Sequence, residues 1–288
     1  MNPTMTESKS SAIRSHTHAL DIAAAPDEVW KAITDPKELV QWFPLEASCK
    51  PGRGGEIRYQ WGELVGICRV QEWQPGKHLR TGWMEMSAEG ASADCPRLTE
   101  TLMPQRAQLA VDWFLEGHGG KTHLRLVHSG FTKDAEWDKE YEGTRRGWQF
   151  ELQALKHYLE HHRGETRHAF WLRERVALGP QDVWNKFAEP GGFFRTVDLA
   201  AGRIGKTYRF VLGNGDELAG AVLINHPPYE FAGTATTLGG GMIRFGFEDC
   251  MGGPEAHVWI ATWGLPSAKT SEVEARWRGM LHQAFPPN

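Results

Sequence analysis

The sequence predicts an α+β protein of two similar units, each built from a curved antiparallel sheet, two short helices and one long closing helix. Three observations predict this class. A stretch of fifteen residues near the N-terminus recurs 154 positions later in the chain. Both copies are followed by short strand-like segments separated by turn residues. Each series of strands ends in a long segment with apolar residues at helical spacing.

The repeated stretch is a helical motif that begins with proline. Residues 26 to 40 read PDEVWKAITDPKELV, and residues 180 to 194 read PQDVWNKFAEPGGFF. The identical positions are Pro26, Val29, Trp30 and Pro36, which recur as Pro180, Val183, Trp184 and Pro190. Proline suits the first turn of a helix, and the acidic residues after it complement the helix dipole. We therefore expect each copy to form short helices that act as the wedge on which a curved sheet closes.

The first unit is expected to start with a strand over residues 14 to 23, because buried and exposed residue types alternate there. The buried face of that strand carries His16, His18, Leu20 and Ile22. Further strands are predicted at 56–61, 64–73, 78–84, 108–116 and 121–129. Residues 88–105 are irregular and could cover the mouth of a pocket. A closing helix is predicted over 133–162.

The second unit repeats this plan. It is expected to begin with a strand over 167–178, in which Phe170, Leu172 and Glu174 share one face. Strands are predicted at 208–212, 217–224, 229–237, 242–248 and 256–263, and a closing helix at 267–285. The predicted organisation is a flexible leader at 1–12, a first domain at 13–163 and a second domain at 166–288.

Composition excludes several classes of protein. A net charge of −4 with acidic and basic residues interspersed gives no basic face, so we expect no nucleic-acid partner. No apolar run is long enough for a membrane span, and the polar first dozen residues do not resemble a signal peptide. We therefore expect a cytoplasmic protein.

The four cysteines are scattered and have no spacing that suits a metal site or a disulfide framework; they are Cys49, Cys68, Cys95 and Cys250. We expect them to be reduced thiols, and we expect no metal and no cofactor. No catalytic motif of the G-x-S-x-G kind occurs, and Gly239-Gly240-Gly241 is a turn without the lysine of a phosphate loop. Whether the chain is an enzyme stays open.

A family resemblance covers nearly all of residues 14 to 162. The motifs that carry it are APDEVWKAITDPKELVQWF, GGEIRY, GICRVQEWQPGKHLRTGW, THLRLVHSGF and GWQFELQALKHYLE, in this order. They resemble the heat-shock-90 ATPase activator-like family, a branch of the SRPBCC superfamily that includes START-type and birch-pollen-allergen-like domains. The second copy keeps the VW helix and GKTYRF but lacks an HSGF-like end. The resemblance implies two helix-grip domains in tandem.

In a helix-grip domain the sheet and the closing helix enclose a cavity, which is where we expect a ligand. The candidate ligand-binding residues are His16, His18, Tyr59, Trp61, Trp83, Trp113, His128 and Trp148 in the first unit, and Glu174 in the second. The alternative is that the indole rings fill the space and leave a solid core with satisfied histidines. Both interpretations stay open at this point.

Two further features have a functional and a structural interpretation. Glu174 lies among apolar neighbours and could be an acid or base with a raised pKa, although a partner arginine or a position at the solvated end of the strand explains it better. His157 and His161 are four residues apart on the closing helix, a spacing that can bind a metal. Without a third ligand they are more simply read as a solvated helix end.

Three functions are consistent with these features. The leading hypothesis is non-covalent binding of a small hydrophobic or amphipathic molecule, with the first unit as its site. The second, implied by the family name alone, is a regulator of a heat-shock-90 ATPase whose partner is a heat-shock chaperone. The third is an enzyme of the cyclase, dehydratase or hydrolase type that uses the cavity.

Overall fold

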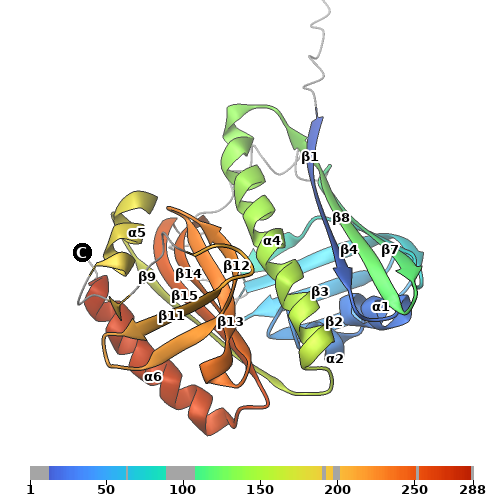
Figure 1. The fold of residues 1–288 in the computed structure, drawn as a ribbon. Coiled ribbons are helices and arrows are strands. Elements are labelled where there is room, and N and C mark those ends of the chain that lie inside the picture. Colours follow the sequence, from blue (N-terminus) through green and yellow to red (C-terminus); the bar gives the residue numbers. More distant parts are fainter. Residues whose placement is uncertain are drawn as a thin grey trace, which may run out of the picture.

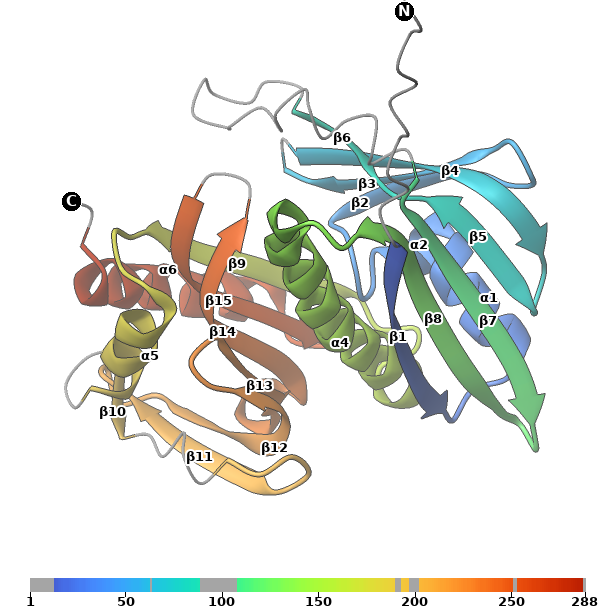
Figure 2. The same cartoon turned by 90° about the horizontal axis from the view of Figure 1, so that it is seen from above.

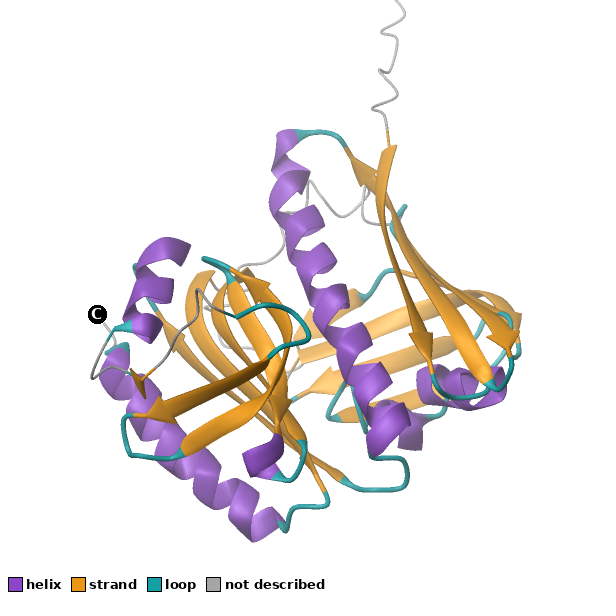
Figure 3. Cartoon of the chain, in the orientation of Figure 1, coloured by secondary structure: helices purple, strands orange, loops and turns teal. Residues whose placement is uncertain are grey.

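The computed structural model describes residues 13–62, 64–88, 108–189, 193–196, 202–250 and 253–286. Its two antiparallel sheets each pack against a long helix, which confirms the predicted α+β class with two similar units (Figure 1). Both halves of the chain begin with a strand and a short helix, continue through antiparallel strands and end in a long helix (Figure 3). Over these residues no helix is long and apolar enough to cross a bilayer.

The first unit holds an eight-stranded sheet in the order β1-β8-β7-β5-β4-β3-β2, with β6 paired to β4. Its strands are β1 (Ile13–Ile22), β2 (Glu46–Lys50), β3 (Glu56–Trp61), β4 (Leu64–Gln74), β5 (His78–Gly82), β6 (Glu85–Ala88), β7 (Ala110–His118) and β8 (Lys121–Thr132). Its helices are α1 (Pro26–Thr34), α2 (Pro36–Leu39), the 3₁₀ turn η1 (Ala135–Trp137) and the closing helix α4 (Asp138–His161).

The second unit holds a seven-stranded sheet in the order β10-β11-β12-β13-β14-β15-β9. Its strands are β9 (Arg167–Arg175), β10 (Phe194–Thr196), β11 (Thr207–Leu212), β12 (Glu217–His226), β13 (Glu230–Ala235), β14 (Gly241–Cys250) and β15 (Gly253–Trp263). Its helices are α5 (Pro180–Ala188), the 3₁₀ turn η2 (Thr236–Leu238) and the closing helix α6 (Ser267–Ala284).

Most predicted elements occur within a few residues of their expected bounds. Strands β2, β6 and β10 were not expected from the sequence. Two short helices were expected in the second copy of the motif, but after α5 the described residues form strand β10, and residues 190–192 lie outside the described residues. Strand β2 is an edge strand whose inward side chains, Ala47 and Cys49, are small and only partly buried, so its alternation is a weak signal. The predicted leader and most of the irregular segment 88–105 lie outside the described residues. The domain bounds at 163 and 166 stay a prediction, and α4 and β9 end and begin on either side of them.

The repeated motif forms α1 and α5, which have nine residues each. In α1 the side chains of Val29, Trp30 and Ile33 are buried against the first sheet. Their counterparts in α5 are Val183, Trp184 and Phe187, which are buried in the core of the second unit. Both copies therefore close the sheet that follows them, as the repeat predicts.

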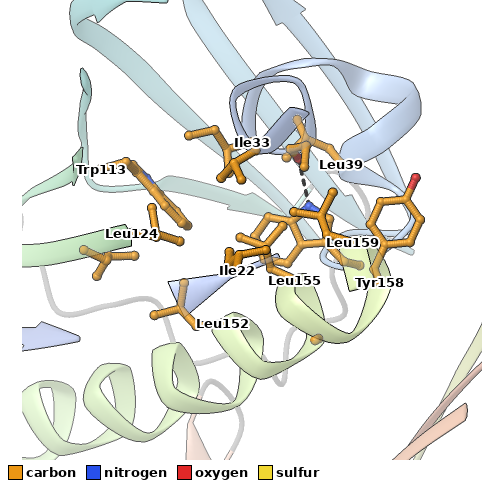
Figure 4. Packing of buried hydrophobic residues seen from close by; sticks show 14 of the residues in the cluster. Ile22, Ile33, Leu39, Trp113, Leu124, Leu152, Leu155, Tyr158 and Leu159 are labelled. Carbon is orange, nitrogen blue, oxygen red and sulfur yellow. Dashed lines mark hydrogen bonds between the residues drawn. The ribbon is translucent and has the colours of Figure 1, made fainter. Parts of the chain in front are cut away.

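Helix α4 lies across the concave face of the first sheet. The apolar stripe that faces the sheet includes Trp148, Leu152, Leu155 and Leu159. Figure 4 shows Leu152, Leu155 and Leu159 packed against Ile22 of β1 and near Leu124 of β8. Their spacing of three or four residues places them on one side of the helix.

The opposite side of α4 packs against the outer face of the second sheet (Figure 2). The ring of Phe150 meets Trp259 of β15 edge to face, with centroids 4.9 Å apart. Strand β15 alternates accordingly: Trp259, Ala261 and Trp263 point to the first unit, whereas Val258, Ile260 and Thr262 point to α6. The second sheet is thus covered by a helix on each face.

Hydrogen bonds hold the two units in a defined orientation. The ring nitrogens Nε2 of His157 and His162 lie 2.6 and 3.1 Å from the carbonyl oxygen of Gly240 and donate to it. The indole Nε1 of Trp263 donates to the carbonyl of Gln41 at 3.0 Å, and its ring stacks on His162. Gly240 has a φ of +78°, a conformation that favours glycine.

We expect Phe150→Ala to lower the free energy of unfolding of the whole chain by about 3–5 kcal/mol, because it leaves a cavity between α4 and the second sheet. Chemical denaturation followed by tryptophan fluorescence measures this change. Phe150→Leu keeps most of the apolar volume and is the matched control, with a smaller loss. A loss of less than about 1 kcal/mol for Phe150→Ala would contradict this packing.

Candidate functional site

The space between α4 and the first sheet is filled by aromatic rings. Phe43 contacts Tyr59 at a centroid distance of 5.2 Å and Trp148 at 5.9 Å, while Trp148 meets Trp113 edge to face at 5.3 Å. Trp83, which follows β5, belongs to the same group, and its ring centroid lies 6.1 Å from that of Trp148. The cavity that these rings leave has a volume of about 10 Å³, which is the space of one water molecule at most.

The candidate residues of the first unit divide into two groups. Four of them line this small cavity: Tyr59, Trp83, Trp113 and Trp148. The others lie beside it. Trp61 is half-buried against Phe43, and the three histidines form a row between the sheet and the N-terminal half of α4. The expected strand parity is therefore observed for β1, since His16 and Ile22 are buried.

The histidine row joins neighbouring strands. The ring of His16 lies 5.3 Å from that of His18 and 5.2 Å from that of His128. Trp148 Nε1 donates to His128 Nδ1 at 3.2 Å, so the proton of neutral His128 sits on Nε2. The Nε2 atom of His16 lies 3.1 Å from the hydroxyl of Thr144 on α4. Two closing-helix side chains thus orient two of the three imidazoles.

Burial keeps these imidazoles neutral. It lowers the pKa of His16 to about 3, with further lowering by the charge of His18 and Arg145. It lowers the pKa of His18 as well, and that of His128 falls well below its ordinary value. A neutral row of this kind donates and accepts single hydrogen bonds and carries no charge for an anion. Across the described ranges no three His, Cys, Asp or Glu side chains are placed to hold a metal ion.

The remaining candidates have structural partners. Glu174 lies on the α6 side of β9 and accepts a hydrogen bond from His282 Nδ1 at 3.1 Å. His157 is not part of a solvated helix end, because its ring is packed against Trp263 and bonded to Gly240. That expectation was wrong for His157, since the second unit covers this turn of α4. His161 is exposed.

Buried charges lie between α4 and the second sheet. Arg244 Nε donates to Glu230 at 2.7 Å, and both side chains are buried. Burial raises the pKa of the neighbouring Glu151 on α4 to about 8, although the guanidinium groups of Arg244 and Arg167 act in the opposite direction. Burial also lowers the pKa of His257 to about 4. These groups belong to the contact between the units, where the ion pair offsets the cost of burial.

The second unit has a groove between α6 and the inner face of its sheet, with a volume of about 400 Å³. Its floor is apolar and consists of Phe170 on β9, Ile260 on β15, Leu238 in η2, Leu265 and the α6 residues Val273 and Trp277. Polar side chains stand at its ends, and they are Asp216, Glu217, Thr237, Thr262, Lys269, Thr270, Glu272 and Arg276. A concave apolar surface with a few polar groups is the usual form of a small-molecule site.

Val273 and Trp277 belong to the closing helix predicted at 267–285, but no sequence pattern assigns them to a site. The groove joins α6 to the turn at Asp216 and to η2, which are distant in sequence. The Asn214-Gly215 turn between the strands predicted at 208–212 and 217–224 brings Asp216 to the end of a strand. The volume left between a helix and a sheet has no signature in the chain.

The family comparison bears on the first unit. Residues 23–160 match the model of the family described as "Activator of Hsp90 ATPase homolog 1-like protein". The first unit is similar to this family over most of its length. The resemblance of its motifs is thereby confirmed, and the Hsp90 ATPase activator-like unit is followed by a second helix-grip unit of the same plan. No curated protein matches the chain significantly.

Several solved structures are similar in fold to the activator-like unit or to the whole chain. The Aha1 dimer from Colwellia psychrerythraea has 18% identity and a TM-score of 0.41, over 52% of this chain and 99% of its own. DynU16, a putative protein of the dynemicin biosynthetic locus, has 18% identity and a TM-score of 0.39, over 94% and 95%. The di-domain ARO/CYC BexL from the BE-7585A pathway has 17% identity and a TM-score of 0.38, over 96% and 99%. The family assignment rests on the sequence match.

We expect the free energy of unfolding to fall as the pH is lowered from about 6.5 toward 4. His16 binds a proton in the unfolded chain near its ordinary pKa of 6.5 but in the folded protein only near 3. His16→Gln removes this proton uptake, so the slope of stability against pH in this window should decrease by up to about 1.4 kcal/mol per pH unit. Urea unfolding at a series of pH values measures the slope.

The exposed His118 in the β7–β8 turn offers a control for this measurement. His118→Gln should leave the slope of the parent protein in place. A slope that is the same in His16→Gln and in the parent would show that His16 is accessible to protons in the folded state.

Proposed function

We propose that this chain binds a small hydrophobic or amphipathic molecule non-covalently, in the groove between α6 and the second sheet. The groove of about 400 Å³ carries the proposal, because its size falls within the range of small-molecule sites and its floor is apolar. The cavity of the activator-like unit is about 10 Å³, and a ligand there would have to displace Trp83, Trp113 or Trp148.

Several buried side chains make the floor of the groove a preformed surface. Ile260 and Trp277 have exposed fractions of 0% and 1% and support the floor from the core behind it, while the partly exposed Leu238, Leu265 and Val273 supply its accessible apolar surface. Trp277 also donates from Nε1 to Asp216 at 3.2 Å, which fixes its ring. A rigid apolar floor spares a ligand part of the entropic cost of ordering its site.

Filling the groove should weaken the binding of a ligand. Val273→Trp places an indole over the floor, and we expect the affinity for N-phenyl-1-naphthylamine, a neutral fluorescent probe, to fall at least about tenfold, which is 1.4 kcal/mol. Fluorescence titration of the probe measures it. Ala275→Trp adds the same side chain at an exposed position of α6 that does not line the groove, and it should bind as the parent does.

Native mass spectrometry of freshly purified protein complements the titration, because a retained molecule would add a discrete mass. Parent protein that neither retains a molecule nor binds the probe would contradict the proposal. So would a Val273→Trp variant that binds the probe with unchanged affinity while its thermal transition shows it to be folded.

A second candidate function rests on the match of residues 23–160 to the Hsp90 ATPase activator-like family. It predicts that the full chain raises the rate of ATP hydrolysis by an Hsp90-type chaperone in a coupled assay. The Val273→Trp variant should stimulate equally, because the groove belongs to the other unit. An ATPase rate that is unchanged over a range of concentrations of the full chain would remove this candidate.

A further inference from the structure

The two ends of the groove between α6 and the second sheet differ in their charge balance. At one end Arg276 pairs with Asp216 at 3.2 Å and with Glu272 at 3.0 Å. Asp216 also accepts a hydrogen bond from Trp277. Glu217, beside them, pairs with Arg209 at 2.5 Å. The charged groups at this end have partners within the protein, so they do not need a ligand to balance them.

The other end carries a cation without such a partner. Lys269 lines the groove in the first turn of α6, and among the residues that the structure describes no carboxylate lies within ion-pair distance of its ammonium group. The first turn of α6 contains no acidic residue, unlike that of α1. The positive end of the helix dipole therefore adds to the charge of Lys269.

Hydroxyl groups stand beside this cation. The oxygens of Thr262 on β15 and Thr270 on α6 lie 3.2 Å apart, and their side chains are only 2% and 7% exposed. The hydroxyl of Thr262 can donate to the carbonyl of His168, 3.4 Å away, or to Thr270. When it donates to Thr270, the proton of Thr270 can turn toward an oxygen atom in the groove. The end of the groove at Lys269 therefore offers a positive charge and one hydroxyl donor to a head group.

The apolar floor leads from this end to the other. Lys269 and Arg276 are seven residues apart on α6, which corresponds to about 10 Å along the helix axis. Val273, Ile260 and Leu238 form the apolar lining, and the carboxylate of Glu272, which lies between Lys269 and Arg276 on α6, is paired with Arg276. A hydrocarbon chain of eight to ten carbons spans about this length.

We propose that the groove selects amphiphiles with a carboxylate head, which lies at Lys269 and Thr270 while the hydrocarbon chain covers the floor toward Trp277. This inference rests on the proposed function and names the class of its ligand. A cationic head would be repelled by Lys269, and a neutral head would leave the charge of Lys269 without a partner. The acid-rich end with Arg276 is already paired and favours no second anion.

Three ten-carbon probes test the choice of head group in the full-length protein: decanoate, decan-1-ol and decylammonium. Isothermal titration at pH 7.5, below their aggregation concentrations, measures their affinities. We expect decanoate to bind about tenfold more tightly than decylammonium, since the exposed lysine attracts one head and repels the other. Added salt should weaken the binding of decanoate and leave that of decan-1-ol unchanged.

Lys269→Met tests the residue itself. This substitution should lower the affinity for decanoate by up to about fivefold and change the affinity for decan-1-ol by less than about twofold, because it removes the charge and keeps the length of the side chain. Lys206→Met, at an exposed turn that does not line the groove, is the control and should bind all three probes as the parent does.

The outcomes separate this inference from the proposed function. If all three probes bind the parent equally and Lys269→Met changes none of them, the groove takes amphiphiles but does not select carboxylates, and only this inference is overturned. If none of them binds, both proposals are wrong.

Discussion

The burial of α4 on two sides is the constraint on which the rest of the structure depends. A closing helix that packs against one sheet needs one apolar stripe. Helix α4 needs two, because Leu152 and Leu155 pack against the first sheet and Phe150 packs against the second. The polar groups of the helix between these stripes are then also enclosed. His157 is paired with Gly240 of the second unit, whereas the buried Oε2 atom of Glu151 has no hydrogen-bond partner among the described residues.

The second sheet is constrained in the same way, because α6 covers one face and α4 the other. Where both helices cover the sheet, as at β14 and β15, no solvated face is left on which polar residues can alternate, whereas β11 alternates exposed Thr207 and Arg209 with buried aromatic residues. The charges on the covered face, such as Arg244 and Glu230, are paired where they are buried. The groove lies on the α6 face, one strand layer away from the activator-like unit.

Much of this arrangement could be predicted from the sequence. The wedge helices follow from the repeated motif with Val29 and Trp30, and the parity of β1 follows from alternation, so the inward direction of His16 is correct. Two features could not be predicted. Whether Trp113 and Trp148 line a pocket or fill it depends on distances of an ångström or less. The residues of the groove come together only when α6, η2 and the turn at Asp216 meet, and no local pattern joins them.

The carbonyl of Gly240 makes the connection between the two units rigid. It accepts hydrogen bonds from the end of α4, at His157 and at His162, just before the chain enters the second unit. The short connection from His162 to Thr166 is therefore held against the second unit by the hydrogen bond from His162 to Gly240. Rotation of one unit against the other would break both bonds and unstack His162 from Trp263. A partner that touches both units thus meets one continuous surface of fixed shape, as it would on a single larger domain.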